Sequence, residues 1–301
     1  MRNTMRTDSN NTCAQQLDSI IDIDSIIITN HARTRYRERW NSSGNIDAIL
    51  QEALKEGVVE DHDNRTVLAD LMRFNSTRSD DTEQTESLAA YFKRMPMKQK
   101  AIYYITAESH SAASTSPHLE IFRKNDVEVL LLSDPVDEWL VSSLNGYKDK
   151  PLKSVAKGAL DLEDLTSPED KKANEAKEKD LAGLTEKMQS LLGERVKSVR
   201  VSQRLTDSPA CLVADETDLG GNLERILQAM GQDAPDAKPI MEINPDHPLI
   251  RQLNPEHAQL EDWSRVLFDQ AALSEGAPLP EPAAYVQRVN NLLTKAALTA
   301  Q

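Results

Sequence analysis

The stretch AIYYITAESHSAASTSPHLEIFRKNDVEVLLLSDPVDEWL, residues 101–140, carries the clearest fold signal in the chain. Residues 101–109 predict a strand that runs into a polar loop. Residues 127–134 form a continuous apolar run, which is typical of a strand covered on both faces. Between them, Ser116 and Pro117 supply an N-cap and a first-turn proline for a helix. Strand, helix and strand at this spacing predict a parallel βαβ unit.

Helices are predicted on both sides of this unit. Upstream, residues 45–57 and 64–74 carry apolar side chains at helical spacing, and residues 87–95 predict a short helix that ends before a proline. Downstream, Pro135 begins a helix that carries Trp139. The polar stretch 75–83 between these segments predicts a loop or a short edge strand. The region from residue 46 to residue 157 therefore has an α/β pattern.

The second half of the chain, residues 158–301, has an α+β pattern. It begins with a charged segment whose continuation into regularly spaced leucines predicts a long, largely exposed helix. The remaining apolar runs predict strands at 195–205, 209–214 and 238–244 and helices at 218–230, 247–253, 255–276 and 282–298. The last two helices form a C-terminal hairpin. Residues 1–45 are a separate, unassigned N-terminal appendage.

The bulk composition restricts the class of protein. Of 301 residues, 39% are hydrophobic and 28% are charged, which suits a soluble, helix-rich globular protein. The net charge of −14 argues against nucleic acid as the main partner, because phosphate binding needs a cationic surface. No run approaches the ~20 apolar residues that span a bilayer, and no secretory signal is present, so we expect a cytoplasmic protein. The two cysteines, Cys13 and Cys211, are interpreted as free thiols.

A search for chemistry finds little in the sequence. Phosphate-binding glycine loops, the GxSxG elbow and the HExxH pair do not occur. The six histidines are scattered singly. The polar cluster from Glu108 to Ser111 lies beside a strand end, where α/β sites often lie, but it is better interpreted as a loop. We therefore expect no catalytic residues and no metal site.

Two apolar features stand out instead, a stripe of side chains and a single tryptophan. Leu219, Leu223, Ile226, Leu227 and Met230 recur at helical spacing after Gly220 and Gly221, which lower helix propensity by roughly 1 kcal/mol each. This stripe is either an ordinary core face or an exposed binding surface on a weakly anchored helix. Trp139, alone, would be a half-buried aromatic packed on the sheet.

The C-terminal hairpin cannot bury both of its apolar faces by itself. It either packs back on its own domain or joins a second copy as a four-helix bundle. Its candidate interface residues lie on two helices: Trp263, Val266, Leu267, Gln270 and Leu273 on the first, and Tyr285, Val286, Val289, Leu292 and Leu293 on the second.

Long motifs occur in a fixed order along the chain. They are AIYYITAES (101–109), SPHLEIFRKNDVEVLLLSDPVDEW (116–139), LLGERVKSVRVSQRLTDSPACLV (191–213) and EINPDHPLI (242–250). Together with the residues around them, from about 46 to 298, they resemble the heat-shock protein 90 chaperone family in its bacterial HtpG type. The resemblance implies that residues 46–157 are the end of the family's middle domain and residues 158–301 its C-terminal dimerisation domain.

The resemblance also implies roles for the residues already described. Client polypeptides would be contacted by Glu138, Trp139, Leu219, Leu223, Ile226 and Leu227, and the C-terminal helices would form the dimer interface. The family uses ATP with magnesium, but none of its nucleotide-site motifs, nor the segment with its ATP-contacting arginine, matches this sequence. We therefore expect a chain that is not itself an enzyme and holds no cofactor.

The implied function is that of a chaperone fragment that binds unfolded or partly folded clients and forms a homodimer. Two alternatives stay open. The chain could be one subunit of a split ATPase chaperone, with a separate ATPase domain supplied by another polypeptide. It could also be a regulatory subunit that forms heterodimers with a full-length chaperone.

Overall fold

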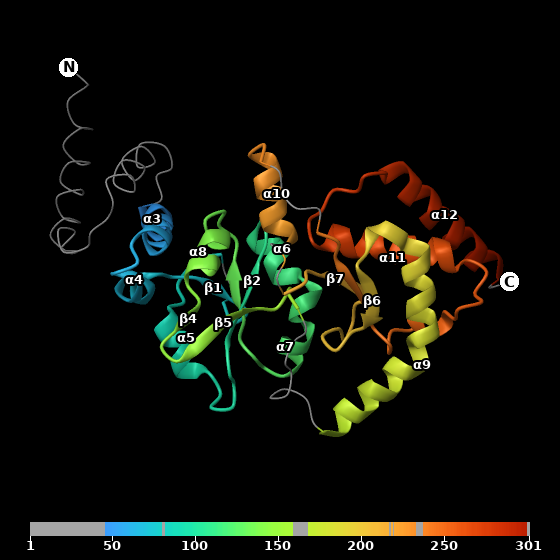
Figure 1. The fold of residues 1–301 in the computed structure, drawn as a ribbon, viewed down its shortest axis with the longest axis horizontal. Helices are drawn as coiled ribbons and strands as arrows, with labels where there is room; N and C mark the ends of the chain where they lie inside the picture. The colour runs from blue at the N-terminus through green and yellow to red at the C-terminus, as the bar shows by residue number, and fades with distance from the viewer. Residues whose placement is uncertain are drawn as a thin grey trace, which may run out of the picture.

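A computed structural model describes residues 46–79, 82–158, 168–216, 218, 220–232 and 237–299. The predicted appendage, residues 1–45, lies outside the described residues. Figure 1 shows two sheets side by side, a five-stranded one in the half nearer the N-terminus and a three-stranded one in the other half.

The predicted βαβ unit forms the centre of the first sheet. Strands β2 (Ile102–Thr106) and β3 (Leu130–Leu132) are parallel, and Tyr104 is paired with Leu130. The expected helix in the connection is formed by the 3₁₀ turn η1 (Pro117–Leu119) followed by α7 (Glu120–Lys124). A further helix, α6 (His110–Thr115), precedes it. Ser109 caps α6 through its side chain, so the polar cluster after β2 begins a helix rather than a loop.

The other strands of this sheet are short. β1 (Asn75–Ser76) pairs antiparallel with β3, which confirms an edge strand in the polar stretch 75–83. On the other side of β2, the hairpin of β4 (Gly146–Tyr147) and β5 (Lys150–Ser154) adds two strands that the apolar pattern does not predict. The strand order is β1-β3-β2-β5-β4. Strand β2 is therefore central, with the parallel neighbours β3 on one side and β5 on the other.

Helices cover both faces of the first sheet, as the continuous apolar strands predict. One face packs on α3 (Ile46–Glu60), α4 (Arg65–Leu71), α5 (Leu88–Arg94) and α8 (Asp137–Ser143), and the other on α6 and α7. The side chains alternate accordingly. Tyr104 and Leu130 point to the first face, whereas Tyr103 and Leu131 point to the second.

The second sheet has the order β6-β8-β7, with β6 (Ser198–Val201) parallel to β8 (Ile240–Ile243) and β7 (Ala210–Val213) antiparallel to β8. These are the three predicted strands. The other elements of this half are α9 (Pro168–Leu192), the turn η2 (Gly193–Arg195), α10 (Gly221–Ala229), α11 (Leu260–Ser274) and α12 (Pro282–Thr299). The segment predicted as a helix at 247–253 is only a 3₁₀ turn, η3 (Ile250–Gln252). The mixed α/β architecture is thus confirmed.

A buried arginine joins the two sheets. Arg204, in the loop between β6 and β7, is 2% exposed and its Nε lies 2.9 Å from the Glu242 carboxylate on β8. Its terminal nitrogens donate to the carbonyls of Val155 and Gly158, in the segment that leaves β5. Burial alone would raise the pKa of Glu242, but Arg204 and Arg200 hold it below its usual range.

Replacing Arg204 with methionine should lower the free energy of unfolding by about 3–5 kcal/mol, because the buried Glu242 carboxylate loses one of its two arginine partners and the carbonyl of Val155 loses its arginine donor. Chemical denaturation measures this change. Arg251→Met is the matched control. Arg251 is 65% exposed and pairs with Asp246 at the surface, so its loss should cost less than about 1 kcal/mol. Equal effects of the two substitutions would show that the Arg204 network does not hold the sheets together.

Candidate functional site

The helix α10 stands apart from the rest of the fold. None of its nine residues is fully buried, in contrast to α11, where eight are. It begins after Gly220, whose φ of 89° favours glycine, and a Cβ there would lie 2.9 Å from Cε of Lys157. The sequence predicted a helix here, at 218–230, and the structure confirms it over Gly221–Ala229.

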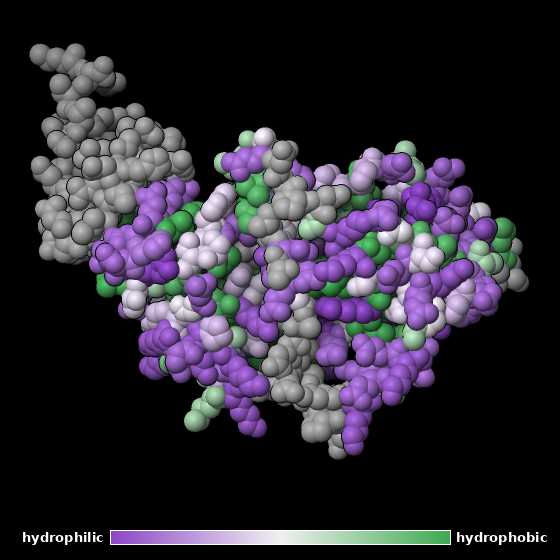
Figure 2. Space-filling view, viewed as in Figure 1, coloured by the Kyte–Doolittle hydropathy of each residue, from purple (hydrophilic) through white to green (hydrophobic). Residues whose placement is uncertain are grey.

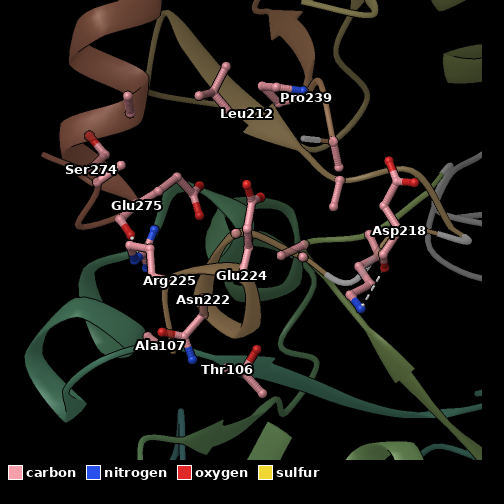
Figure 3. Close-up of a pocket in the computed structure, with 18 of the residues that line it drawn as sticks. Thr106, Ala107, Leu212, Asp218, Asn222, Glu224, Arg225, Pro239, Ser274 and Glu275 are labelled. Carbon is pink, nitrogen blue, oxygen red and sulfur yellow. Dashed lines mark hydrogen bonds between the residues drawn. The ribbon is translucent and has the colours of Figure 1, made fainter. Parts of the chain in front are cut away.

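A cavity of about 480 Å³ lies beneath α10. Its floor is formed by the carboxyl ends of the parallel strands β2 and β5, near Thr106 and Ser154, where α/β proteins often bind ligands. In Figure 3, Asn222, Glu224 and Arg225 reach into it from α10, and Glu275 approaches from the end of α11. The side of α10 that faces the protein is therefore polar.

The apolar stripe lies on the opposite side of α10. At 100° per residue, the stripe residues Leu223, Ile226 and Leu227 are turned away from the residues that line the cavity. They are half-buried, Met230 is 60% exposed, and none belongs to a hydrophobic cluster formed by the described residues. Figure 2 shows hydrophobic surface over this helix. The stripe is therefore not part of a hydrophobic core formed by the described residues.

Leu219, the remaining predicted stripe residue, lies outside the described residues.

The other predicted client-contacting residues lie on α8, next to α10. Nδ2 of Asn222 donates to Oε1 of Glu138 at 2.6 Å, so the structure brings the two predicted elements together. Trp139 is half-buried, as expected for a helix aromatic beside a sheet. Glu138, however, is only 4% exposed. In this conformation its carboxylate binds Asn222 rather than solvent.

A buried lysine fixes the start of α8. Nζ of Lys55, on α3, lies 2.7 Å from Asp134 and 2.8 Å from Asp137, and it also donates to Gln84. Burial raises the pKa of Asp137 to about 6, although Lys55 opposes this shift. Burial acts in the same direction on Asp134, but Lys55 and Gln84 lower its pKa overall. The sequence analysis did not predict this ion-pair cluster, because Lys55 lies 79 residues from Asp134 along the chain.

The predicted dimer residues divide into three groups. Val266, Leu267 and Leu292 are buried inside the protomer, and α11 packs on the second sheet. Trp263, Tyr285 and Val289 are half-buried. Gln270, Leu273, Val286 and Leu293 are exposed, the last two by 52% and 62%. The hairpin thus packs back on its own sheet through one face and still presents an apolar stripe on α12.

In the described part of the chain, no group of three or more histidine, cysteine, aspartate or glutamate side chains is gathered as a metal site. Within the same residues, no helix is both long and apolar enough to cross a membrane.

Comparison with known proteins identifies the family. The sequence model described as "Hsp90 protein" matches residues 28–301. The chain belongs to the Hsp90 family. The match includes residues 28–45, which the sequence alone left unassigned.

Bacterial relatives are similar over most of this Hsp90 chain. It is 51% identical to chaperone protein HtpG of Nitrosomonas europaea over 259 residues, which are 86% of this chain and 39% of that protein. It is 52% identical to chaperone protein HtpG of Aromatoleum aromaticum over 261 residues, 87% of this chain and 39% of the relative. The HtpG of Ruthia magnifica is 51% identical, with 40% of its length covered. The chain therefore spans about two fifths of the length of these relatives.

Replacing Lys55 with methionine should lower the free energy of unfolding by about 3–5 kcal/mol, because Asp134 and Asp137 would then lie close together without a counter-charge. Lys93→Met, on the exposed side of α5, is the control and should have little effect. Adding Asp137→Asn to Lys55→Met should restore part of the loss, since it removes one of the two unpaired charges. No recovery in the double variant, measured by chemical denaturation, would contradict this account of the cluster.

Proposed function

We propose that this Hsp90 chain binds unfolded or partly folded client polypeptides through the apolar stripe of α10 and associates as a homodimer through α12. The observation that supports client binding most directly is the orientation of α10. Its polar side faces the protein, and Leu223, Ile226 and Leu227 lie on the other side. A stripe of flexible apolar side chains suits promiscuous contact with many sequences.

The acidic character of the chain suits the same role. A net charge of −14 favours partners that expose basic as well as apolar segments, as unfolded polypeptides do. We further propose that residues 46–299 make these contacts without nucleotide, in the cytoplasm, and that any ATP-driven step of the family needs residues outside this region.

The double variant Leu223→Ser with Ile226→Ser should bind a permanently unfolded client roughly 10- to 30-fold more weakly than the unaltered chain. Each substitution removes a contact worth about 1 kcal/mol, and 1.4 kcal/mol is a tenfold change in Kd. Fluorescence anisotropy with a labelled client measures this, with and without magnesium ATP, which should make no difference.

The control for this experiment is Gln228→Ser, on the cavity side of the same helix. It should bind as the unaltered chain does. Unchanged affinity in the double variant, with the fold intact, would remove α10 from the client surface.

The dimer proposal rests on Val286 and Leu293, which are two helical turns apart on the outer side of α12. Replacing both with aspartate should convert a dimer at micromolar concentration to a monomer without unfolding the protomer, because both side chains are already exposed in it. Sedimentation or light scattering gives the mass. Gln287→Asp, one position away on α12, should leave the dimer intact, and a monomeric unaltered chain at this concentration would contradict the proposal.

A further inference from the structure

We propose that the hydrogen bond between Glu138 and Asn222 is a latch that docks α10 on α8, so that Glu138 positions the client-binding helix instead of contacting clients itself. The link from this latch to client binding rests on the proposed function of α10. The latch itself, however, can be tested without any client.

The geometry of the bond supports this role. It joins side chains 84 residues apart at 2.6 Å, from the first turn of α10 to the first turn of α8. Its acceptor is a carboxylate, and hydrogen bonds to ionised acceptors are about twice as strong as neutral ones. A negative charge beside the first turn of α10 also suits the positive end of the helix dipole.

The burial of Glu138 makes its carboxylate depend on the amide of Asn222. Its side chain is 4% exposed, and its charge acts on Lys157, whose pKa it raises against the lowering effect of burial. A buried carboxylate that loses a donor suffers the full cost of desolvation. Docking of α10 is therefore tied to Asn222 presenting its amide to this carboxylate.

Two further hydrogen bonds among the described residues hold α10 and the segment before it. Nζ of Lys157 donates to the carbonyl of Asp218 at 3.0 Å, just before the helix, and Arg225 donates to the carbonyl of Glu275 at 3.0 Å. The apolar stripe adds no packing with the described hydrophobic clusters. Because α10 packs into none of these clusters, breaking one strong polar contact should shift it between docked and undocked states.

The decisive experiment exchanges donor and acceptor. Asn222→Asp places two carboxylates together and should undock α10. Glu138→Gln with Asn222→Asp restores an amide–carboxylate hydrogen bond in the reverse direction and should dock it again. Hydrogen exchange measured by mass spectrometry over residues 221–229 reports docking directly.

The expected results are quantitative. Asn222→Asp should exchange at least tenfold faster over α10 than the unaltered chain, and the reciprocal double variant should return to within about threefold of it. Gln232→Glu adds the same charge just after the helix, at an exposed position, and should exchange as the unaltered chain does. Exchange in α11 should be the same in every variant, which separates undocking from general unfolding.

Two outcomes would overturn the latch. One is unchanged exchange over α10 in Asn222→Asp, and the other is failure of the reciprocal double variant to restore protection. Client binding is then measured on the same variants. If the unaltered chain binds no client while the exchange pattern is as expected, the proposed function fails and the latch stands.

Discussion

The arrangement of this chain depends on one buried arginine. The side chain of Arg204 extends from the second sheet to the segment after β5. There it donates to the carbonyls of Val155 and Gly158, and it also pairs with Glu242. A charge at this depth is tolerated only because every side of the guanidinium has a partner. From α7, the carboxylate of Glu120 adds a second tie by accepting the backbone amides of Thr206, Asp207 and Ser208.

These ties determine what α10 can do. They hold β7 and the end of α11 opposite the carboxyl ends of β2 and β5, and the space between them is the cavity. The helix that closes this space must turn a polar side inward, because the walls supply Lys157, Glu275 and Thr106. Its apolar residues are left on the outer side. The way the two sheets are joined thus explains why the polar side of α10 faces the protein and its apolar side faces outward.

Much of the fold follows from local sequence pattern. The continuous apolar run at 127–134 and the spacing of the helices predict the central βαβ unit, and further apolar runs predict the three strands of the second sheet. Such predictions work because a strand buried on both faces is apolar throughout, whereas a strand buried on one face alternates. The β4–β5 hairpin was missed because GYKDKPLKS has no apolar alternation. Its strands form through backbone pairing at the sheet edge.

The site was predicted less completely than the fold. The α10 stripe is visible in the sequence, but the polar residues that place it are not, since Lys55, Asn222 and Arg204 look like ordinary surface residues there. Their partners lie 79, 84 and 38 residues away, and no periodicity connects them. The position of the Glu138 carboxylate could not be predicted from the sequence either. A resemblance can suggest that it matters, but only the fold shows that its carboxylate is buried under α10.

The contrast between these contacts indicates where the molecule can move. Separating the two sheets would take the buried guanidinium of Arg204 away from the carbonyls of Val155 and Gly158, at a cost that is a large fraction of a domain's stability. Displacing α10 would break the hydrogen bonds of Asn222 with Glu138 and of Arg225 with Glu275, and it would disturb none of the described hydrophobic clusters. A partner that offers apolar surface can repay that smaller cost through the stripe on the helix. Movement should therefore be concentrated in α10, while the joined sheets act as the rigid frame against which it docks.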